Sequence, residues 1–348
     1  MDGIIKKDIR NFSKVALEEW IVGMGEKKFR AKQIYEWLWQ KGCTDFEEMS
    51  NLPKTTRQLL ADKFEIRAIR QDKIQKSTDN TIKTRWQLFD GHLVESVLIP
   101  VQYDNRYTVC VSSQVGCSLT CMFCATGKMG RIRNLDASEI FDQVWLVNQQ
   151  AIEHFQHPIT NIVFMGMGEP LLNYQNVMGS IERITAPDGL NMSPRRITIS
   201  TAGIAKMIKR LADDASKVNL ALSLHAADDT KRNEIMPINE TNNLAVLMDA
   251  LTYFYQHTKG RISYEYIALR DKNDSLQDAA KLAKLCQSFP VRVNIIEYNP
   301  IGDGLYEKSD EDTIDRFAAF LAKQNVPVTV RRSRGKDIDA ACGQLANK

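Results

Sequence analysis

Neither sign of charge is in marked excess in this sequence of 348 residues. Lysine and arginine number 46 against 43 aspartate and glutamate, which leaves a formal net charge of +3. So small a charge does not by itself indicate a nucleic-acid partner, because such binding would depend on local clusters of basic side chains. The overall charge therefore permits RNA binding without requiring it.

Long apolar runs are also missing. No run approaches 18 apolar residues, the length of a membrane-spanning helix, and residues 1–8 lack the apolar core of a secretory signal. Seven cysteines in such a chain are expected to remain reduced in the cytosol, where they serve as ligands or nucleophiles. We therefore expect a cytoplasmic protein without membrane contact.

No low-complexity segment or short repeat interrupts the chain, whose length allows one large α/β domain or several smaller ones. Residues from about 12 to 65 show helical spacing, and Ile34, Trp37 and Leu38 share one helix face among basic residues. From about residue 82 the apolar period changes to two, and Asp90-Gly91 provides a hairpin turn. The expected segments are a basic helical domain (1–80), a hairpin linker (81–104), a sheet-and-helix domain (105–330) and a C-terminal segment (331–348).

After the hairpin, strand-like and helix-like runs alternate regularly. Such alternation is typical of a parallel sheet covered by its crossover helices. Six units are fewer than the eight of a closed barrel, so we expect an α/β fold with a partial (β/α)6 barrel, whose ligand-binding residues follow the carboxyl ends of the strands. The expected strands are 107–112, 161–165, 196–200, 218–223, 262–267 and 291–297, with a last strand at 326–331; the expected helices are 137–155, 174–184, 204–213, 244–258, 276–288 and 310–324.

Three cysteines follow the first of these strands in one short loop. Cys117, Cys121 and Cys124 have the spacing C-x3-C-x2-C, with no fourth cysteine. Three thiolates on a four-iron cluster leave one iron open to another ligand. This spacing resembles the signature of radical S-adenosylmethionine (SAM) enzymes, in which the open iron binds SAM. A zinc site and a set of buried thiols are the alternatives.

Polar residues follow several other strands. The turn Met165–Pro170 is rich in glycine, so its backbone can approach a ligand closely, and Glu169 can accept a hydrogen bond. With Gly168 it resembles the element of radical SAM enzymes that binds the SAM amino group. For the polar residues after the other strands, the alternative is that they simply cap or turn the chain at strand ends. The expected cofactor-binding residues are Gly168, Glu169, Ser200, Ser223, Leu224, His225 and Asn299.

Two further cysteines and one glutamate stand out. Cys342 lies in a polar C-terminal segment just after a basic run, which is a poor place for a core residue. A free cysteine is usually a small buried hydrophobe, which we expect for Cys43 and Cys286 and which remains open for Cys110. Glu95 interrupts an apolar row of the hairpin if that face is buried, and it is solvent-exposed if the opposite face is buried. A buried carboxylate there would suit proton transfer.

Taken together, five sequence segments resemble the RlmN family of bacterial dual-specificity RNA methyltransferases over nearly the whole chain. The pair of cysteines placed around the cluster loop is specific to that family and to its sister family. The matching segments are Glu95, Cys110, Ser112–Cys117, Gly166–Pro170 and Ala340–Gln344.

The resemblance implies an activity. The family methylates C2 of one adenine in the peptidyl-transferase centre of 23S rRNA and C2 of the adenosine 3′ of the anticodon in certain tRNAs, using two SAM molecules and a [4Fe-4S] cluster. It further implies a flavodoxin-type electron donor, a thiol reductant and a monomer. Expected RNA contacts are Lys27, Lys28, Arg30, Lys32, Trp37, Trp39 and the run Arg331–Lys336; a solvated face with core tryptophans is the alternative.

The resemblance also assigns roles to residues. Cys342 takes a methyl group from one SAM, and a radical derived from a second SAM removes a hydrogen from that methyl, whose carbon then adds to C2. Glu95 and Cys110 are the candidates to accept the C2 proton, with Glu95 expected as the acceptor. Attack of Cys110 on the Cys342 sulfur then releases the RNA and leaves a disulfide that a reductant must open.

Two other functions stay open at this point. The sister family methylates C8 of the same adenine, confers antibiotic resistance and shares these cysteines. A non-catalytic iron–sulfur protein that binds RNA and senses redox state would need neither an open iron nor Cys342.

Overall fold

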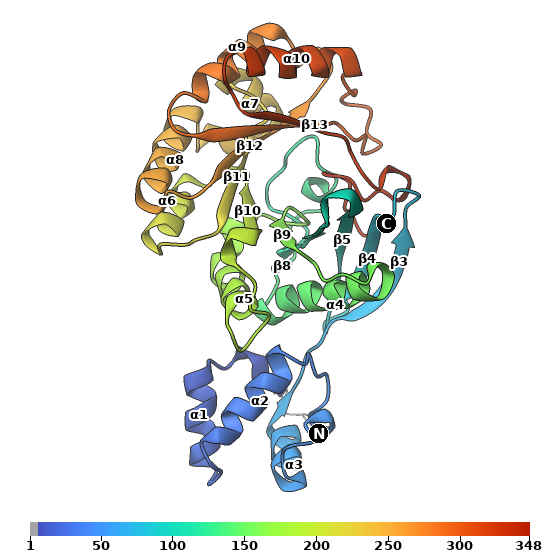
Figure 1. The fold of residues 1–348 in the computed structure, drawn as a ribbon, viewed down its shortest axis with the longest axis vertical. Helices are drawn as coiled ribbons and strands as arrows, with labels where there is room; N and C mark the ends of the chain where they lie inside the picture. Colours follow the sequence, from blue (N-terminus) through green and yellow to red (C-terminus); the bar gives the residue numbers. More distant parts are fainter. Residues whose placement is uncertain (1–5) are drawn as a thin grey trace.

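The computed structural model describes residues 6–348 and shows a small helical unit at one end of a larger unit built around a curved sheet (Figure 1). Ten strands form that sheet in the order β14-β13-β12-β11-β10-β9-β6-β5-β4-β3. The strands are β3 (Arg70–Lys76), β4 (Ile82–Gln87), β5 (Leu93–Val101), β6 (Arg106–Cys110), β9 (Asn161–Phe164), β10 (Ile197–Thr201), β11 (Asn219–Ser223), β12 (Ile262–Ala268), β13 (Val291–Glu297) and β14 (Val328–Arg331).

The sheet is parallel on one side and antiparallel on the other. From β6 through β9 to β14 each strand runs parallel to its neighbour, because each connection passes through a helix on the outer face. Strands β3, β4 and β5 pair antiparallel and extend the sheet beyond β6. The covering helices are α4 (Ala137–Phe155), α5 (Tyr174–Thr185), α6 (Ala205–Asp213), α7 (Asp229–Ile235), α8 (Leu244–Thr258), α9 (Leu276–Leu285) and α10 (Glu311–Lys323).

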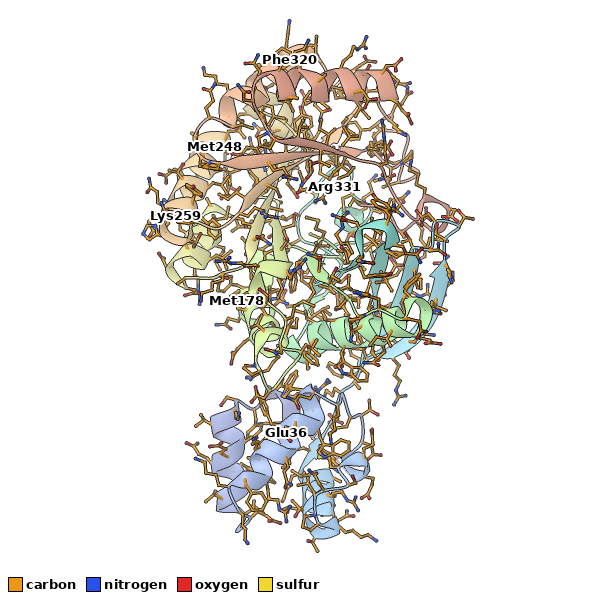
Figure 2. The ribbon with its side chains drawn as sticks, viewed as in Figure 1. Glu36, Met178, Met248, Lys259, Phe320 and Arg331 are labelled. Atoms are coloured by element: carbon orange, nitrogen blue, oxygen red, sulfur yellow. The ribbon has the colours of Figure 1, made fainter. Side chains whose placement is uncertain are left out.

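This architecture confirms the expected partial barrel. Figure 2 shows side chains throughout the space between the strands and the outer helices. The buried side chains there form an apolar core. Two of the covering helices begin at capping boxes that satisfy their first amides: Asp136 with Glu139 at the start of α4, and Ser275 with Asp278 at the start of α9. None of the helices in residues 6–348 is long and apolar enough to cross a membrane.

The helical unit contains α1 (Lys14–Gly23), α2 (Phe29–Trp39) and α3 (Lys54–Lys63), together with the short strands β1 (Lys7–Asp8) and β2 (Phe64–Glu65). Trp39 packs edge-on against Phe141 of α4 with ring centroids 5.0 Å apart, and buried Arg10 pairs with Asp142 of α4 at 2.7 Å. These contacts attach the unit to the barrel. Strand β3 belongs to the sheet, although the expected boundary near residue 80 assigned it to the helical unit.

The C-terminal segment turns back from β14 and crosses the antiparallel hairpin, so that the C terminus lies beside β4 (Figure 1). Asp337 accepts hydrogen bonds from the Ser77 hydroxyl at 2.5 Å and the Thr78 amide at 3.1 Å, and Asp79 accepts one from the Gly335 amide at 2.9 Å. The polar segment is therefore ordered by the turn that joins β3 to β4.

Candidate active site

A cavity lies at the carboxyl ends of the parallel strands, where the sequence placed the site. Its walls come from the cysteine loop, the turns after β9, β10 and β11, the inner face of β12 and β13, and the C-terminal segment. The expected site residues among its lining are Cys117, Cys121, Cys124, Gly168, Glu169, Ser200, Ser223, His225 and Cys342.

The cysteine loop is held close to the barrel by glycines and by α4. A Cβ atom at Gly116, whose φ is +72°, would lie 1.8 Å from the Gly130 carbonyl oxygen, so the turn requires glycine. Fully buried Gln143 of α4 accepts a hydrogen bond from the Ser112 amide and donates one to the Ser112 carbonyl. The end of β6 is thus fixed where the loop begins.

The three cysteines are free thiols in largely apolar surroundings. Burial raises the pKa of Cys117 to about 11 and raises that of Cys121 well above its ordinary value. Such thiols lose their protons when a metal binds. No group of three or more His, Cys, Asp or Glu side chains in residues 6–348 has the arrangement of a site for one metal ion. Three thiols from one loop, beside open cavity space, fit an iron–sulfur cluster with one free position.

Glu169 is buried in the turn after β9. Its two oxygens accept hydrogen bonds from the Leu171 amide at 3.0 Å and the Ala202 amide at 2.7 Å. Burial nevertheless raises the pKa of Glu169 to about 7. Gly168 has φ +99°, and a Cβ there would lie 2.5 Å from the Gln114 side chain. The turn therefore presents a carboxyl group that can accept a further hydrogen bond from an amino group of a ligand.

Ser200, Ser223 and His225 lie together on the adjacent wall. The hydroxyl oxygens of Ser200 and Ser223 are 3.4 Å apart. Burial, reinforced by the charge of Arg232, lowers the pKa of His225 to about 3, and its Nδ1 accepts the Ile267 amide at 3.1 Å. The ring is therefore neutral with its proton on Nε2, which is left as a donor.

Two expected cofactor-binding residues do not line this cavity. The Leu224 side chain is fully buried in the core. The Leu224 backbone carbonyl accepts a hydrogen bond from Arg232 Nε at 3.0 Å. Asn299 is buried and donates to the Cys342 carbonyl at 3.5 Å. The sequence placed both correctly at strand ends but could not tell how each would point.

Cys342 is exposed to the cavity and is held against the cysteine loop. The Ala125 amide donates to the Gly343 carbonyl at 2.8 Å, and the Thr126 hydroxyl donates to the Leu345 carbonyl at 2.6 Å. Two segments more than 200 residues apart are thereby joined. The structure brings Cys342 to the expected cluster site.

Cys110 ends β6 outside the cavity lining. It is buried, and burial together with the neighbouring Cys342 raises its pKa far above the ordinary value. The structure describes both as free thiols. Cys43 is buried in the core, as expected, whereas Cys286 is only half-buried and packs at the edge of the core.

Glu95 is fully buried, which excludes the solvent-exposed alternative. It lies beneath the C-terminal segment and does not line the cavity. Its Oε2 accepts the amides of Ala346 at 3.0 Å and Asn347 at 3.1 Å, and its Oε1 lies 3.4 Å from Nζ of buried Lys83. The carboxylate therefore anchors the segment that carries Cys342.

Sequence reasoning missed Arg232, which organises the site from behind. Its guanidinium is fully buried and donates to the carbonyls of Leu224 and Ala202 and to the Asn239 side chain. It thereby ties together the turns after β10 and β11. Its surroundings in the sequence, Asp229–Ile235, are mostly charged and resemble a solvated helix, so no local signal marks it.

The expected RNA contacts lie in two places, the helical unit and the C-terminal run Arg331–Lys336. Trp39 is a buried core residue, as the alternative stated, whereas Trp37 is partly exposed with Lys41 Nζ 3.6 Å from its ring centre. In the C-terminal run, Arg332 and Lys336 contact buried Glu297 at 3.0 and 2.9 Å. Burial alone would raise the pKa of Glu297, but these hydrogen bonds outweigh it and hold the pKa near 2. Part of the run is thus neutralised internally.

Comparisons with known proteins find relatives that match almost the whole chain. A family model for the ribosomal RNA large subunit methyltransferase N-terminal domain matches residues 7–66, and one for the radical SAM superfamily matches residues 111–283. The chain is 54% identical over 343 residues to a Christiangramia forsetii protein named "Probable dual-specificity RNA methyltransferase RlmN", covering 99% of this chain and 97% of the relative. It is 42% identical to the "Dual-specificity RNA methyltransferase RlmN 2" of Myxococcus xanthus, covering 98% and 91%.

One solved structure is similar over almost the entire fold. The crystal structure of a radical SAM methyltransferase from Sphaerobacter thermophilus has a TM-score of 0.93 and 38% sequence identity. The similarity covers 98% of this chain and 100% of that one. The helical unit, the sheet and the C-terminal segment are therefore shared as a whole.

Proposed function

Because the chain belongs to the RlmN family of radical SAM dual-specificity RNA methyltransferases, we propose that it methylates C2 of adenosine in the peptidyl-transferase centre of 23S rRNA and C2 of the adenosine 3′ of the anticodon in tRNAs. One observation carries the proposal: a lone C-terminal cysteine lies in the same cavity as the three-cysteine loop and Glu169. A SAM-binding protein without catalysis would have no use for Cys342 in that position.

The residues of the cavity divide the work of holding SAM. Glu169 accepts from the amino group, while the Ser200 and Ser223 hydroxyls and the Nε2 of His225 are among the polar groups that face the rest of the molecule. Asn299 supports this wall by holding the Cys342 carbonyl. Cys117, Cys121 and Cys124 would hold an iron–sulfur cluster, which would supply the electron for the cleavage of SAM.

Cys342 carries the methyl group through the reaction, and Cys110 releases the product. An aromatic C2–H is neither nucleophilic nor acidic, so a direct displacement on SAM is not available to the RNA. The Cys342 thiolate instead takes the methyl from one SAM, forming a new S–C bond as the sulfonium S–C bond breaks. A radical derived from a second SAM would take a hydrogen atom from that methyl, its carbon would add to C2, and the adduct would return one electron to the cluster. The C2 proton passes to Glu95 or Cys110. Attack of the Cys110 thiolate on the Cys342 sulfur then forms the S–S bond as the S–C bond breaks, and the freed carbon takes up a proton to become the methyl group of the RNA.

Glu95 does not line the cavity, so it needs a rearrangement before it can take a proton from a substrate there. One of its oxygens is already bonded to the amides of Ala346 and Asn347. We therefore propose that the C-terminal segment shifts during the second half of the reaction, when RNA is tied to Cys342. A flavodoxin-type donor and a thiol reductant would restore the cluster and the two cysteines, and we propose that the chain acts as a cytoplasmic monomer.

Trideuteromethyl-SAM tests this function. The reconstituted protein, with Cys342 unmethylated at the start, is incubated anaerobically with labelled SAM, reductant and a 23S rRNA fragment, and the nucleosides are analysed by mass spectrometry. We expect 2-methyladenosine with two of the three deuterium atoms, because one is lost from the methyl on Cys342. Full retention would contradict the radical route, and absence of methylation despite an intact cluster would favour the RNA-binding redox sensor.

The same experiment separates the second candidate. The sister family methylates C8, and it shares the cysteines that the cavity displays. An 8-methyladenosine product would assign this chain to that chemistry. The sequence feature that favours C2 is Pro170 directly after Glu169, and the overall identity to RlmN proteins supports it.

A further inference from the structure

Lys83 is a buried lysine that the proposed reaction does not use. It lies on β4 with only 2% of its surface exposed. In the antiparallel pairing Lys83 faces Val97 and Arg85 faces Glu95, so all four side chains point to the same side of the hairpin. The C-terminal segment covers that side. Lys83 is thus placed between the hairpin and the segment that carries Cys342.

The ammonium group of Lys83 joins two parts of the molecule. It lies 3.4 Å from Oε1 of Glu95 and donates to the Asp339 carbonyl at 3.3 Å. Asp339 precedes Cys342 by three residues. This contact therefore fixes the chain on the N-terminal side of the reactive cysteine.

Glu95 fixes the chain on the other side. Its second oxygen accepts the amides of Ala346 and Asn347, and Arg85 adds a hydrogen bond to the Asn347 carbonyl at 2.9 Å. Ala346 follows Cys342 by four residues. One buried ion pair therefore holds both flanks of the loop, while Ala125 and Thr126 hold its middle.

A buried ion pair of this kind is better suited to fixing a conformation than to adding stability. Removing two charges from water costs about as much as their attraction returns, so an apolar pair of the same size would serve a stable core equally well. Unlike an apolar pair, the ion pair can also form hydrogen bonds with the backbone. Lys83 and Glu95 direct theirs at residues 339, 346 and 347 of the C-terminal segment. The hairpin is therefore built to specify where residues 339–347 lie.

We propose that Lys83, acting through Glu95, is a positioning residue that sets the place of Cys342 in the cavity. The inference rests on the proposed function in that Cys342 carries the methyl group. Lys83 does not line the cavity that is proposed to bind SAM. Loss of Lys83 should leave SAM binding and cleavage intact. Fewer of the cleavage events should then lead to methyl transfer.

The ratio of 5′-deoxyadenosine formed to methyladenosine formed measures that coupling. In Lys83→Met the aliphatic stem remains and the charge is lost, so the segment loses its contact at Asp339 and Glu95 loses its partner. We expect the ratio to rise about tenfold or more, because misplacing a reacting group by about 1 Å can slow a reaction about a hundredfold. Hydrogen exchange of residues 339–347 should accelerate in the same variant, while the spectrum of the cluster with SAM stays unchanged.

Three further proteins complete the design. Lys83→Arg keeps a cation beside Glu95 and should restore most of the coupling. Lys73→Met removes an exposed lysine from the neighbouring edge strand β3 and should behave as wild type. A chain ending at Leu345 lacks both amides that bind Glu95 and should show raised exchange and a raised ratio with Lys83 intact, which keeps the test available if Lys83→Met does not fold.

The outcomes separate this inference from the proposed function. If wild type forms 2-methyladenosine and both Lys83→Met and the shortened chain keep its ratio and its exchange, the positioning role is wrong and the function stands. If wild type forms none, the proposed function fails. The exchange of residues 339–347 then still decides whether Lys83 holds the segment.

Discussion

The Thr126 hydroxyl donates a hydrogen bond of 2.6 Å to the Leu345 carbonyl, which connects the cysteine loop directly to the C-terminal segment. The Thr126 side chain is buried, so water cannot easily replace the bond. The loop proposed to bind the cluster and the loop carrying Cys342 therefore form one structural unit. A ligand that orders the cysteine loop is therefore expected to order the loop that carries Cys342 as well.

A Thr126→Val substitution tests this connection. Valine keeps the shape of threonine but leaves the Leu345 carbonyl without its donor, at a cost of about 1 kcal/mol in the free energy of unfolding. We expect a several-fold slower methylation of Cys342, measured by intact-protein mass spectrometry, with cluster content unchanged. Thr55→Val, at an exposed position of α3, is the matched control. Equal rates in the two variants would show that the bond does not guide Cys342.

Replacing Cys110 isolates the final step of the proposed reaction. Cys110→Ala retains Cys342 and the cavity, so methylation of Cys342 and addition to RNA should proceed. Without the attacking thiol, RNA should remain covalently attached to the protein, which a denaturing gel with labelled RNA detects. Cys286→Ala removes a half-buried thiol at the end of α9 and should release RNA normally. Free RNA from Cys110→Ala would remove that residue from the resolving role.

Arg232 is predicted to support both stability and SAM binding. Arg232→Met leaves the carbonyls of Ala202 and Leu224 buried without donors, so we expect a loss of about 3 kcal/mol in the free energy of unfolding. Urea unfolding measures that loss. SAM affinity should fall as well, because the turns presenting Ser200 and His225 are no longer tied together. Arg210→Met, at a half-exposed position of α6, should change neither quantity.

The strands and helices of the barrel were predictable because their apolar patterns are local. The expected strand 291–297 and the expected helices 137–155 and 244–258 match β13, α4 and α8 without a shift. Strand β3 was missed because nearly all of Arg70–Lys76 is exposed, so no alternation of apolar residues marks it. Only its pairing with β4 makes it a strand.

The site residues also divide into those that local sequence reveals and those that it does not. Glu169 and the three cysteines occur in short motifs, so the sequence reveals them. Lys83 and Arg232 act through partners far away in the chain, and a buried lysine or arginine has the same local sequence as a solvated one. Folding alone brings such partners together, which is why neither residue could be assigned a role beforehand.

The pKa of Glu169 leads to a pH dependence of SAM binding. Because burial places it near 7 rather than at its ordinary value, Glu169 is mostly ionised at pH 8 and mostly protonated at pH 6. The ionised form accepts a hydrogen bond from the SAM amino group more strongly, so the dissociation constant should rise about three- to tenfold from pH 8 to pH 6. Equilibrium binding to the cluster-loaded protein measures it. Glu169→Gln cannot titrate and should bind weakly with little pH dependence, whereas an equal slope in that variant would assign the titration to another group.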